Sequence, residues 1–504
     1  KKIIKTRKEF NGDYTVVLFP ILPLLKIKPN EIGQEIGKYL IDNENFIEDF
    51  NIIQGFLNLS IADFFLVDLL KGLDENLKFN YDLINEYFLI EFSSPNTNKP
   101  LHLGHVRNIL LGDSISRIFN EVGNYVHKTQ IINDRGIHIC KSMVAWLQFG
   151  KDTNPESLNL KGDGFVGNFY VKYNEEFEKQ VNELVSNGMS EDEAKNNAPI
   201  YKDAKELLIK WENGDKEVMN LWKKMNSWVY EGFSVTYENL NVSFDSEYFE
   251  SNTYLKGKEI VLKGLNDKIF YQKDDNSVWV NLEPYGLDEK ILLRSDGTSV
   301  YITQDIGTAF LRYKDHPKMD GMIYTTGNEQ DYHFKVLFKI LSLLGYRWAD
   351  KLNHLSYGMV DLPTGKMKSR EGLVVDADEL IESMNKKSKS ISESLGKIND
   401  LSALDQNKLY KQVSLAALKY HILKVDPKKS ILFDPNESID FNGNTGPFIQ
   451  YTYARIKSLS RKNKNKMNFT KVNLSKKEKD LIIQLNDLPN VILNAYKNLN
   501  PGLI

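Results

Sequence analysis

Two histidines and a glycine, His102, Gly104 and His105, are the residues whose types and spacing could do chemistry on a phosphate group. They follow a strand-like apolar run at 86–92 and open a helix-like run. A strand, a short loop and a helix N-terminus together form an anion site, because free backbone N–H groups and the helix dipole face the ligand. The histidines are three positions apart and would share a helix face, and the glycine permits close approach of a nucleotide. We predict nucleotide binding here, with two ligand-free helix-start histidines as the alternative.

A second motif, at 365–372, is a basic loop bounded by glycines that contains Lys366. It follows the apolar-rich run 355–362, which has the character of a strand. A mobile basic loop of this kind can close over phosphates. Either motif alone is weak, and their order along one chain is what makes them informative.

Together these motifs make the chain resemble the class I aminoacyl-tRNA synthetases, whose signatures read His-Ile-Gly-His and Lys-Met-Ser-Lys-Ser. Three further stretches are similar to the arginyl members in particular: EFSSPN at 91–96, YITQDIG at 301–307 and GNTGPFIQY at 443–451. The resemblance covers nearly the whole chain. It implies an arginine–tRNA ligase, which activates L-arginine with ATP to arginyl-adenylate and pyrophosphate and then transfers arginine to the 3′-terminal adenosine of its tRNA.

The resemblance also implies roles in catalysis. His102 and His105 would donate hydrogen bonds to the pentavalent phosphorus centre, Gly104 would make room for the adenosine, and Lys366 would hold the leaving pyrophosphate. This chemistry needs charge and alignment more than a nucleophile or a general base. The residues expected to bind ATP are Gly104, His102, His105, Gly327, Met359, Lys366 and Lys368. For Gly327, a strand-to-helix turn with a capping asparagine is the alternative.

The chain departs from the class pattern after Lys366, because Lys368-Ser369 stands where the motif has Ser-Lys. Many arginyl enzymes lack the second motif lysine and use one just ahead of the first histidine, which here is Lys99. We therefore expect Lys99 to contact phosphate, with Lys368 or Arg370 as further candidates. A solvated loop lysine is the alternative for Lys99.

A substrate guanidinium is planar and permanently charged, so its selection requires carboxylates placed for paired hydrogen bonds. The resemblance implies two such carboxylates, Glu91 and Asp305, in the amino-acid pocket. The arginine-binding residues expected are Glu91, Asn96, Tyr301, Asp305 and Gln330. By pattern alone, Tyr301 and Asp305 are an ordinary i,i+4 helix pair and Glu91 is an exposed charge at a strand end.

The fold class expected is α/β: a Rossmann-type parallel-sheet catalytic domain with an insertion, a small α+β N-terminal domain and an all-α C-terminal anticodon-binding region. The resemblance implies that the N-terminal domain, which we place at 1–78, contacts the tRNA elbow. We place the catalytic domain at 79–375, with the insertion at about 152–288. A helical stem-contact region at 376–440 and the anticodon-binding domain at 441–504 follow. Both terminal domains are expected to be trimmed.

Composition sets limits on the partners. The net charge is −3, so RNA contact must come from local basic surfaces such as the lysine-rich stretch 455–479. Its expected tRNA-binding residues are Arg455, Arg461 and Lys462, and a solvated helical face is the alternative. A single cysteine, Cys140, is expected in a core and indicates a reducing compartment. We expect a cytoplasmic monomer without membrane segments or a structural metal, with Mg²⁺ entering together with ATP.

Three classes of function stay open at this point. They are an arginyl-tRNA synthetase, a small-molecule nucleotidyltransferase of the His-x-Gly-His superfamily, and a catalytically silent tRNA-binding relative. Chain length disfavours the second, and the retained histidines and pocket carboxylates disfavour the third. The lysine, glutamate and cysteine enzymes are the alternatives within class I.

Overall fold

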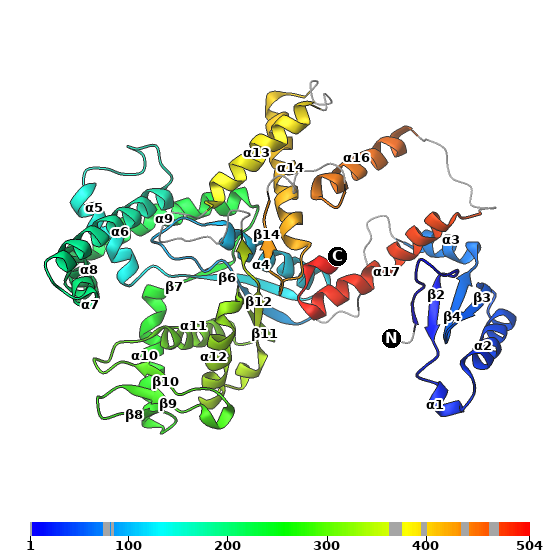
Figure 1. Cartoon of the computed structure of the whole chain (residues 1–504), viewed down its shortest axis with the longest axis horizontal. Coiled ribbons are helices and arrows are strands. Elements are labelled where there is room, and N and C mark those ends of the chain that lie inside the picture. Colours follow the sequence, from blue (N-terminus) through cyan, green and yellow to red (C-terminus); the bar gives the residue numbers. More distant parts are fainter. Residues whose placement is uncertain are drawn as a thin grey trace. The chain divides into compact units, whose positions relative to one another are not determined.

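The computed structural model describes residues 3–73, 81, 85–361, 375–394, 401–434, 443–462 and 473–504. The chain forms two compact units (Figure 1). The first comprises residues 1–82, 457–494 and Ile504, and the second comprises residues 83–456 and 495–503. Within the described part of the chain, no helix is long and apolar enough to cross a membrane.

The first unit contains a four-stranded antiparallel sheet in the order β1-β2-β4-β3. Its elements are β1 (Ile3–Lys5), β2 (Tyr14–Val17), α1 (Leu22–Leu25), α2 (Pro29–Asn43), β3 (Ile47–Ile53), β4 (Phe56–Ile61) and α3 (Asp63–Gly72). Leu18, Leu57 and Leu66 are fully buried in its core. Ile482 and Ile483 of α17 (Lys476–Asn498) complete this core, so a helix from the far end of the sequence packs onto the expected α+β domain.

The second unit is built on a five-stranded parallel sheet in the order β12-β11-β5-β6-β7. The strands are β5 (Tyr87–Glu91), β6 (Tyr125–Ile132), β7 (Ser246–Phe249), β11 (Gly321–Gly327) and β12 (Leu352–Tyr357). From β5 the chain moves first toward β6 and β7, and later returns to form β11 and β12 on the other side. The strand order therefore reverses between β5 and β11, and ligands of open parallel sheets bind at the carboxyl ends of the strands at such a point.

Helices cover both faces of this sheet, as an apolar run buried on two sides requires. Leu89 and Ile90 of β5 are fully buried and point to opposite faces, because side chains alternate along a strand. Ile90 packs in a cluster with α4 (Leu103–Glu121), α13 (Ala377–Ser394) and α14 (Ala403–Leu423). Leu89 packs in a second cluster with α10 (Glu250–Asn266), α11 (Tyr301–Asp315) and α12 (Asp331–Leu343). The expected Rossmann-type architecture is confirmed.

The helices between β6 and β7 lie next to one another (Figure 1). They are α5 (Ile137–Phe149), α6 (Gly162–Ser186), α7 (Glu191–Asn197), α8 (Pro199–Glu212) and α9 (Lys216–Asn239). Their boundaries have local causes: Ser190 and Glu193 form a capping box at the start of α7, and Pro199 occupies the first turn of α8. The range of about 152–288 expected for the insertion stays a prediction, and β7, which lies within it, pairs with β6 in the main sheet. A four-residue strand carries too little pattern to be recognised from sequence.

The remaining elements of the described chain are mostly short. Within 271–293 the chain forms a three-stranded antiparallel sheet, and the expected helical C-terminal region is confirmed. These elements are β8 (Tyr271–Gln272), β9 (Val278–Val280), η1 (Glu283–Tyr285), β10 (Lys290–Leu293), η2 (Asn328–Gln330), η3 (Arg347–Lys351), β13 (Val360–Asp361), β14 (Ile431–Leu432), α16 (Gly446–Lys462) and η5 (Pro501–Leu503). Cys140, on α5, is buried in the hydrophobic core, as expected.

Candidate active site

The N-terminus of α4 brings the two histidines together. His102 is the N-cap of the helix and has extended backbone angles, φ −131° and ψ 173°, so it precedes the helix rather than lying within it. Its Nδ1 accepts a 3.1 Å hydrogen bond from the Gly104 N–H, and the Nδ1 of His105 accepts one of 3.1 Å from the His102 N–H. The ring centroids are 3.9 Å apart. The two imidazoles therefore form a reciprocal cap and lie side by side, as their spacing predicts.

Both imidazoles are neutral at physiological pH. Burial, and then the nearby charge of Lys99, lowers the pKa of His102 to about 4. Burial, His102 and Lys99 hold the pKa of His105 well below its usual value. Because each Nδ1 accepts a hydrogen bond, we assign the proton of each ring to Nε2. Each ring can then donate an Nε2–H to an anionic ligand, and the Lys99 ammonium acts on both rings.

The loop between β5 and α4 is held in an unusual backbone conformation. Ser93 and Ser94 both have positive φ angles, 72° and 47°. Such angles are costly for residues other than glycine and persist where surrounding contacts enforce them. Here the Ser93 N–H donates to the side chain of Asn108 on α4, and the Ser93 hydroxyl lies 2.7 Å from that of Tyr237. Contacts with α4 and with α9 thus fix the backbone of the loop that leads from β5 to the histidines.

A chain segment that follows the second motif pairs directly with the histidine loop. The Leu103 N–H donates to the Val375 carbonyl at 3.0 Å, and the Ala377 N–H donates to the Leu101 carbonyl at 2.9 Å. Asp376 and His102 are therefore paired as in an antiparallel bridge. Lys366, Lys368 and Arg370 lie outside the described residues, and their roles toward phosphate stay predictions.

A cavity of about 880 Å³ opens at the carboxyl ends of the strands, where the sheet order reverses. All five residues expected to bind arginine line it: Glu91, Asn96, Tyr301, Asp305 and Gln330. They come from the end of β5, the loop after it, the start of α11 and η2. Residues separated by more than two hundred positions in sequence are thus brought to one cavity.

The two expected carboxylates of the cavity have different partners. Glu91 is buried and forms an ion pair with Arg312, which is itself fully buried, and it accepts a 2.9 Å hydrogen bond from the Ser94 hydroxyl. Asp305 is 42% exposed and accepts a 2.6 Å hydrogen bond from Nε2 of His333. The charge of Glu91 is therefore already compensated within the protein, while the Asp305 carboxylate is open to a ligand.

Sequence reasoning missed a charged group at another side of the same cavity. The Arg135 guanidinium lies 4.0 Å from the ring centroid of Tyr254 and contacts Glu212 at 3.0 Å and Glu250 at 3.7 Å. Burial raises the pKa of Glu250 to about 7, an effect that Arg135 opposes. These residues come from loops and helices far apart in the chain, so no local spacing marks them as a group.

The other residues expected to bind ATP are placed around the ends of β11 and β12. Gly327 ends β11, and a Cβ atom there would lie 2.2 Å from the Glu329 carboxylate. Met359 is 48% exposed, and its carbonyl accepts a 3.1 Å hydrogen bond from Arg107 of α4. The Thr326 hydroxyl lies 2.7 Å from Nε2 of His354. None of these contacts by itself identifies a nucleotide site.

The basic residues expected to bind tRNA fall into two groups. Arg455, Arg461 and Lys462 are exposed on α16 and stay predictions. Lys479, which the sequence assigned to the same basic surface, instead forms ion pairs with Asp63 at 2.7 Å and Glu48 at 3.8 Å. Long-range pairing of this kind cannot be read from a local excess of lysine.

In the described ranges, no group of three or more His, Cys, Asp or Glu residues could hold a metal ion. A divalent ion that accompanies ATP needs no such group, because Mg²⁺ retains water and phosphate oxygens as ligands.

Comparison with known families identifies this constellation. The family model of the class I (R) tRNA synthetase catalytic domain matches residues 74–434, and that of the DALR anticodon binding domain matches residues 449–504. The chain belongs to the class I arginyl-tRNA synthetases. As a member of this family it is an arginine–tRNA ligase that uses ATP. The small-molecule nucleotidyltransferase and the lysine, glutamate and cysteine enzymes are no longer needed as alternatives.

Relatives support this membership over nearly the full chain. The arginine–tRNA ligase of Flavobacterium psychrophilum is 53% identical over 513 residues, which cover 99% of this chain and 85% of the relative. That of Bacteroides fragilis is 51% identical over 507 residues, with the same shares. The solved arginyl-tRNA synthetase of Thermus thermophilus matches with a TM-score of 0.78 at 25% identity, covering 99% of this chain and 85% of the other. The structure from Plasmodium falciparum matches in fold, with a TM-score of 0.70 at 21% identity.

Proposed function

We propose that arginine activation takes place in the cavity at the carboxyl ends of β5 and β11, next to the N-terminus of α4. The observation that carries this proposal is the convergence of all five expected arginine-binding residues on one cavity. The loop that runs from Glu91 at the end of β5 to His102 connects a residue that lines this cavity to the histidines. A bound arginine would then present its carboxylate toward a nucleotide held at α4.

The open Asp305 carboxylate is the principal recognition group for the guanidinium in this proposal. Its exposure and position in the cavity suit a paired, charge-assisted hydrogen bond to a planar cation. Tyr301, one helical turn earlier, adds a hydroxyl. Glu91 shapes the floor of the pocket, while Asn96 and Gln330 hold the α-amino and carboxylate ends of the substrate.

In the first step, an oxygen of the arginine carboxylate attacks the α-phosphorus of ATP. The bond between that phosphorus and the bridging oxygen breaks, and pyrophosphate leaves with the electron pair. Negative charge on the phosphoryl oxygens is stabilised by fixed hydrogen-bond donors, here the Nε2–H groups of His102 and His105. Lys99, whose charge already acts on both rings, and Lys366 with Lys368 would neutralise the phosphates, with Mg²⁺ bound to the nucleotide.

The second step transfers arginine to a hydroxyl, in class I enzymes the 2′-OH, of the terminal adenosine of arginine tRNA. We propose that residues 1–78 contact the tRNA elbow, that residues 376–440 contact its stem and that residues 441–504 bind the anticodon. The DALR match at 449–504 and the exposed Arg455, Arg461 and Lys462 support the last assignment. We also propose that the protein acts in the cytoplasm as a monomer.

Replacing Asp305 by asparagine tests the pocket. We expect Asp305→Asn to raise the KM for arginine by roughly 10- to 100-fold, because a hydrogen bond to a charged group contributes about 1.5–3 kcal/mol. The KM for ATP should stay within about twofold, since the carboxylate faces the amino acid. Both constants are measured by arginine-dependent ATP–pyrophosphate exchange in the presence of tRNA.

Asp315→Asn is the matched control, because Asp315 lies at the other end of α11 and accepts a hydrogen bond from Tyr248. It should leave both constants near those of the unmodified protein. Equal increases in the two KM values for Asp305→Asn would remove Asp305 from the arginine pocket.

A further inference from the structure

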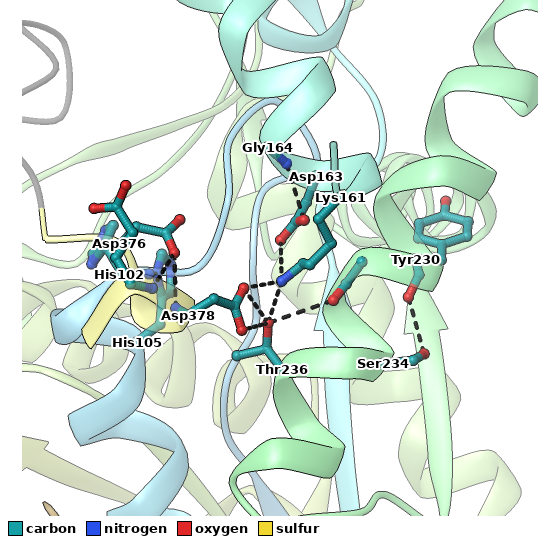
Figure 2. Close-up of polar contacts among 12 residues, drawn as sticks. His102, His105, Lys161, Asp163, Gly164, Tyr230, Ser234, Thr236, Asp376 and Asp378 are labelled. Atoms are coloured by element: carbon teal, nitrogen blue, oxygen red, sulfur yellow. Dashed lines mark hydrogen bonds and ion pairs between the residues drawn. The ribbon is translucent and has the colours of Figure 1, made fainter. Parts of the chain in front are cut away.

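A partly buried ionic cluster lies near the histidine loop, at the start of α6 (Figure 2). Its members, here called the Lys161 cluster, are Lys161, Asp163, Thr236 and Asp378. The Lys161 ammonium contacts the Asp163 carboxylate at 3.2 Å, donates to the Thr236 hydroxyl at 2.6 Å and forms an ion pair with Asp378. Thr236 in turn donates to Asp378 at 3.1 Å. One ammonium thus joins α6, α9 and the first turn of α13.

The packing around the Lys161 cluster leaves it little freedom. Asp163 and Thr236 are fully buried, and a Cβ atom at Gly232 of α9 would lie 2.4 Å from the Asp163 carboxylate. Burial raises the pKa of Asp163 to about 6, and the charge of Lys161 opposes this shift. An ion pair enclosed in this way is fixed in geometry, and removal of one partner leaves a buried charge without compensation.

From Asp378 the connection to His102 is short and consists of backbone contacts. Asp376 accepts hydrogen bonds from the N–H groups of Asp378 and Glu379 and so caps α13. The residues on either side of Asp376 pair with Leu101 and Leu103, the neighbours of His102, through the two backbone hydrogen bonds described above. A shift of Asp378 would therefore move the strand that fixes the His102 backbone.

A second contact from α6 supports the same loop. Gly167 packs against Pro100, and a Cβ atom at this glycine would lie 2.7 Å from Cδ of the proline. The second turn of α6 thus contacts the histidine loop at Pro100, ahead of His102. Lys161, just before α6, is connected to the same loop through its ion pair with Asp378.

We propose that Lys161, acting through Asp378 and the Val375–Ala377 segment, is a positioning residue for His102 in arginine activation. This inference rests on the proposed function. It assigns to the helices between β6 and β7 a part in aligning the reaction, although neither Lys161 nor Asp378 lines the substrate cavity. Misplacement of a reacting group by about 1 Å can cost on the order of 100-fold in rate, so indirect support of this kind is measurable.

The test is Asp378→Ala, with Glu379→Ala as the matched control that removes the neighbouring, exposed acid from the same helix turn. Asp378→Ala leaves the contact between Lys161 and buried Asp163 in place, so the variant should fold. We expect kcat for arginine-dependent ATP–pyrophosphate exchange to fall about tenfold, with the KM for arginine within twofold. Glu379→Ala should match the unmodified protein in both constants.

Amide hydrogen exchange provides a readout that does not depend on activity. Peptides that contain Leu103 and Ala377 should exchange roughly tenfold faster in Asp378→Ala than in Glu379→Ala, while peptides from α5 stay unchanged. Lys161→Met should lower kcat by the same factor. The double variant Lys161→Met/Asp378→Ala should have the same kcat as either single variant, because both substitutions remove the same ion pair.

An unchanged kcat in Asp378→Ala would overturn the inference, whether or not amide exchange is faster. A fall in kcat without faster exchange at Leu103 would also overturn it, since the effect would not pass through the histidine loop. If the unmodified protein shows no arginine-dependent exchange at all, the proposed function fails, and the amide-exchange comparison then decides the structural connection separately.

Discussion

His102→Asn should lower kcat for arginine activation about 100-fold or more while changing the KM for arginine and for ATP only a few-fold. Asparagine is a good N-cap and can accept the hydrogen bond from the Gly104 N–H, but it places no donor where Nε2–H stands in histidine. A donor directed at charge that develops in the transition state contributes on the order of 100- to 1,000-fold in rate. Single-turnover formation of arginyl-adenylate, with tRNA present, measures this step directly.

His102→Gln is the companion variant, because the side-chain amide of glutamine can place an N–H near the position of Nε2. We expect it to recover part of the lost rate, although it caps α4 less well. If His102→Asn is as fast as the unmodified protein while His102→Gln is slow, helix capping rather than hydrogen-bond donation is the role of His102. If both are as fast as the unmodified protein, His102 is not part of the catalytic site.

The largest loss of stability is expected from Arg312→Met. Arg312 is fully buried, and its partner Glu91 is almost so. Removing one member of a buried ion pair leaves an uncompensated charge and costs about 3–5 kcal/mol. The unit that contains the five-stranded parallel sheet should therefore unfold at a lower denaturant concentration. The unfolding midpoint of the unit formed by residues 1–82 and 457–494 should be unchanged.

The double variant Glu91→Gln/Arg312→Met separates the charge effect from lost packing. A neutral amide in place of the Glu91 carboxylate removes the uncompensated charge, so the double variant should be more stable than Arg312→Met alone. A loss below about 1 kcal/mol for Arg312→Met would contradict the buried ion pair. The pair matters for the proposed function because it fixes Glu91, which lines the cavity.

Local signals explain why much of the catalytic fold was predictable. The apolar run that becomes β5 and the helix-like run that becomes α4 each lie within twenty consecutive residues, and both elements form where the pattern places them. The two motif histidines were predictable in the same way, because their spacing of three positions is itself local. Only the position of His102 as the cap rather than within the helix differs.

The arginine pocket could not be obtained from pattern alone. Tyr301 and Asp305 look like any i,i+4 pair, and they became candidates only through the resemblance to arginyl enzymes. The pairing of Glu91 with Arg312 joins residues 221 positions apart, so it leaves no local trace. The same reason accounts for Arg135 beside Glu250 and for the pairing of Lys479 with Asp63. The strand β7 has only four residues, too few to show a pattern.

The measurement that tests the central claim most directly is ATP–pyrophosphate exchange with each amino acid in turn, with and without total tRNA. We expect exchange with arginine alone, and only when tRNA is added, because arginyl enzymes commonly require bound tRNA to activate arginine. Lysine is the decisive comparison, since it carries the same charge but cannot form paired hydrogen bonds with a carboxylate. Exchange with lysine as fast as with arginine would contradict the proposed pocket. A protein that binds tRNA yet shows no exchange with any amino acid would be a catalytically silent relative.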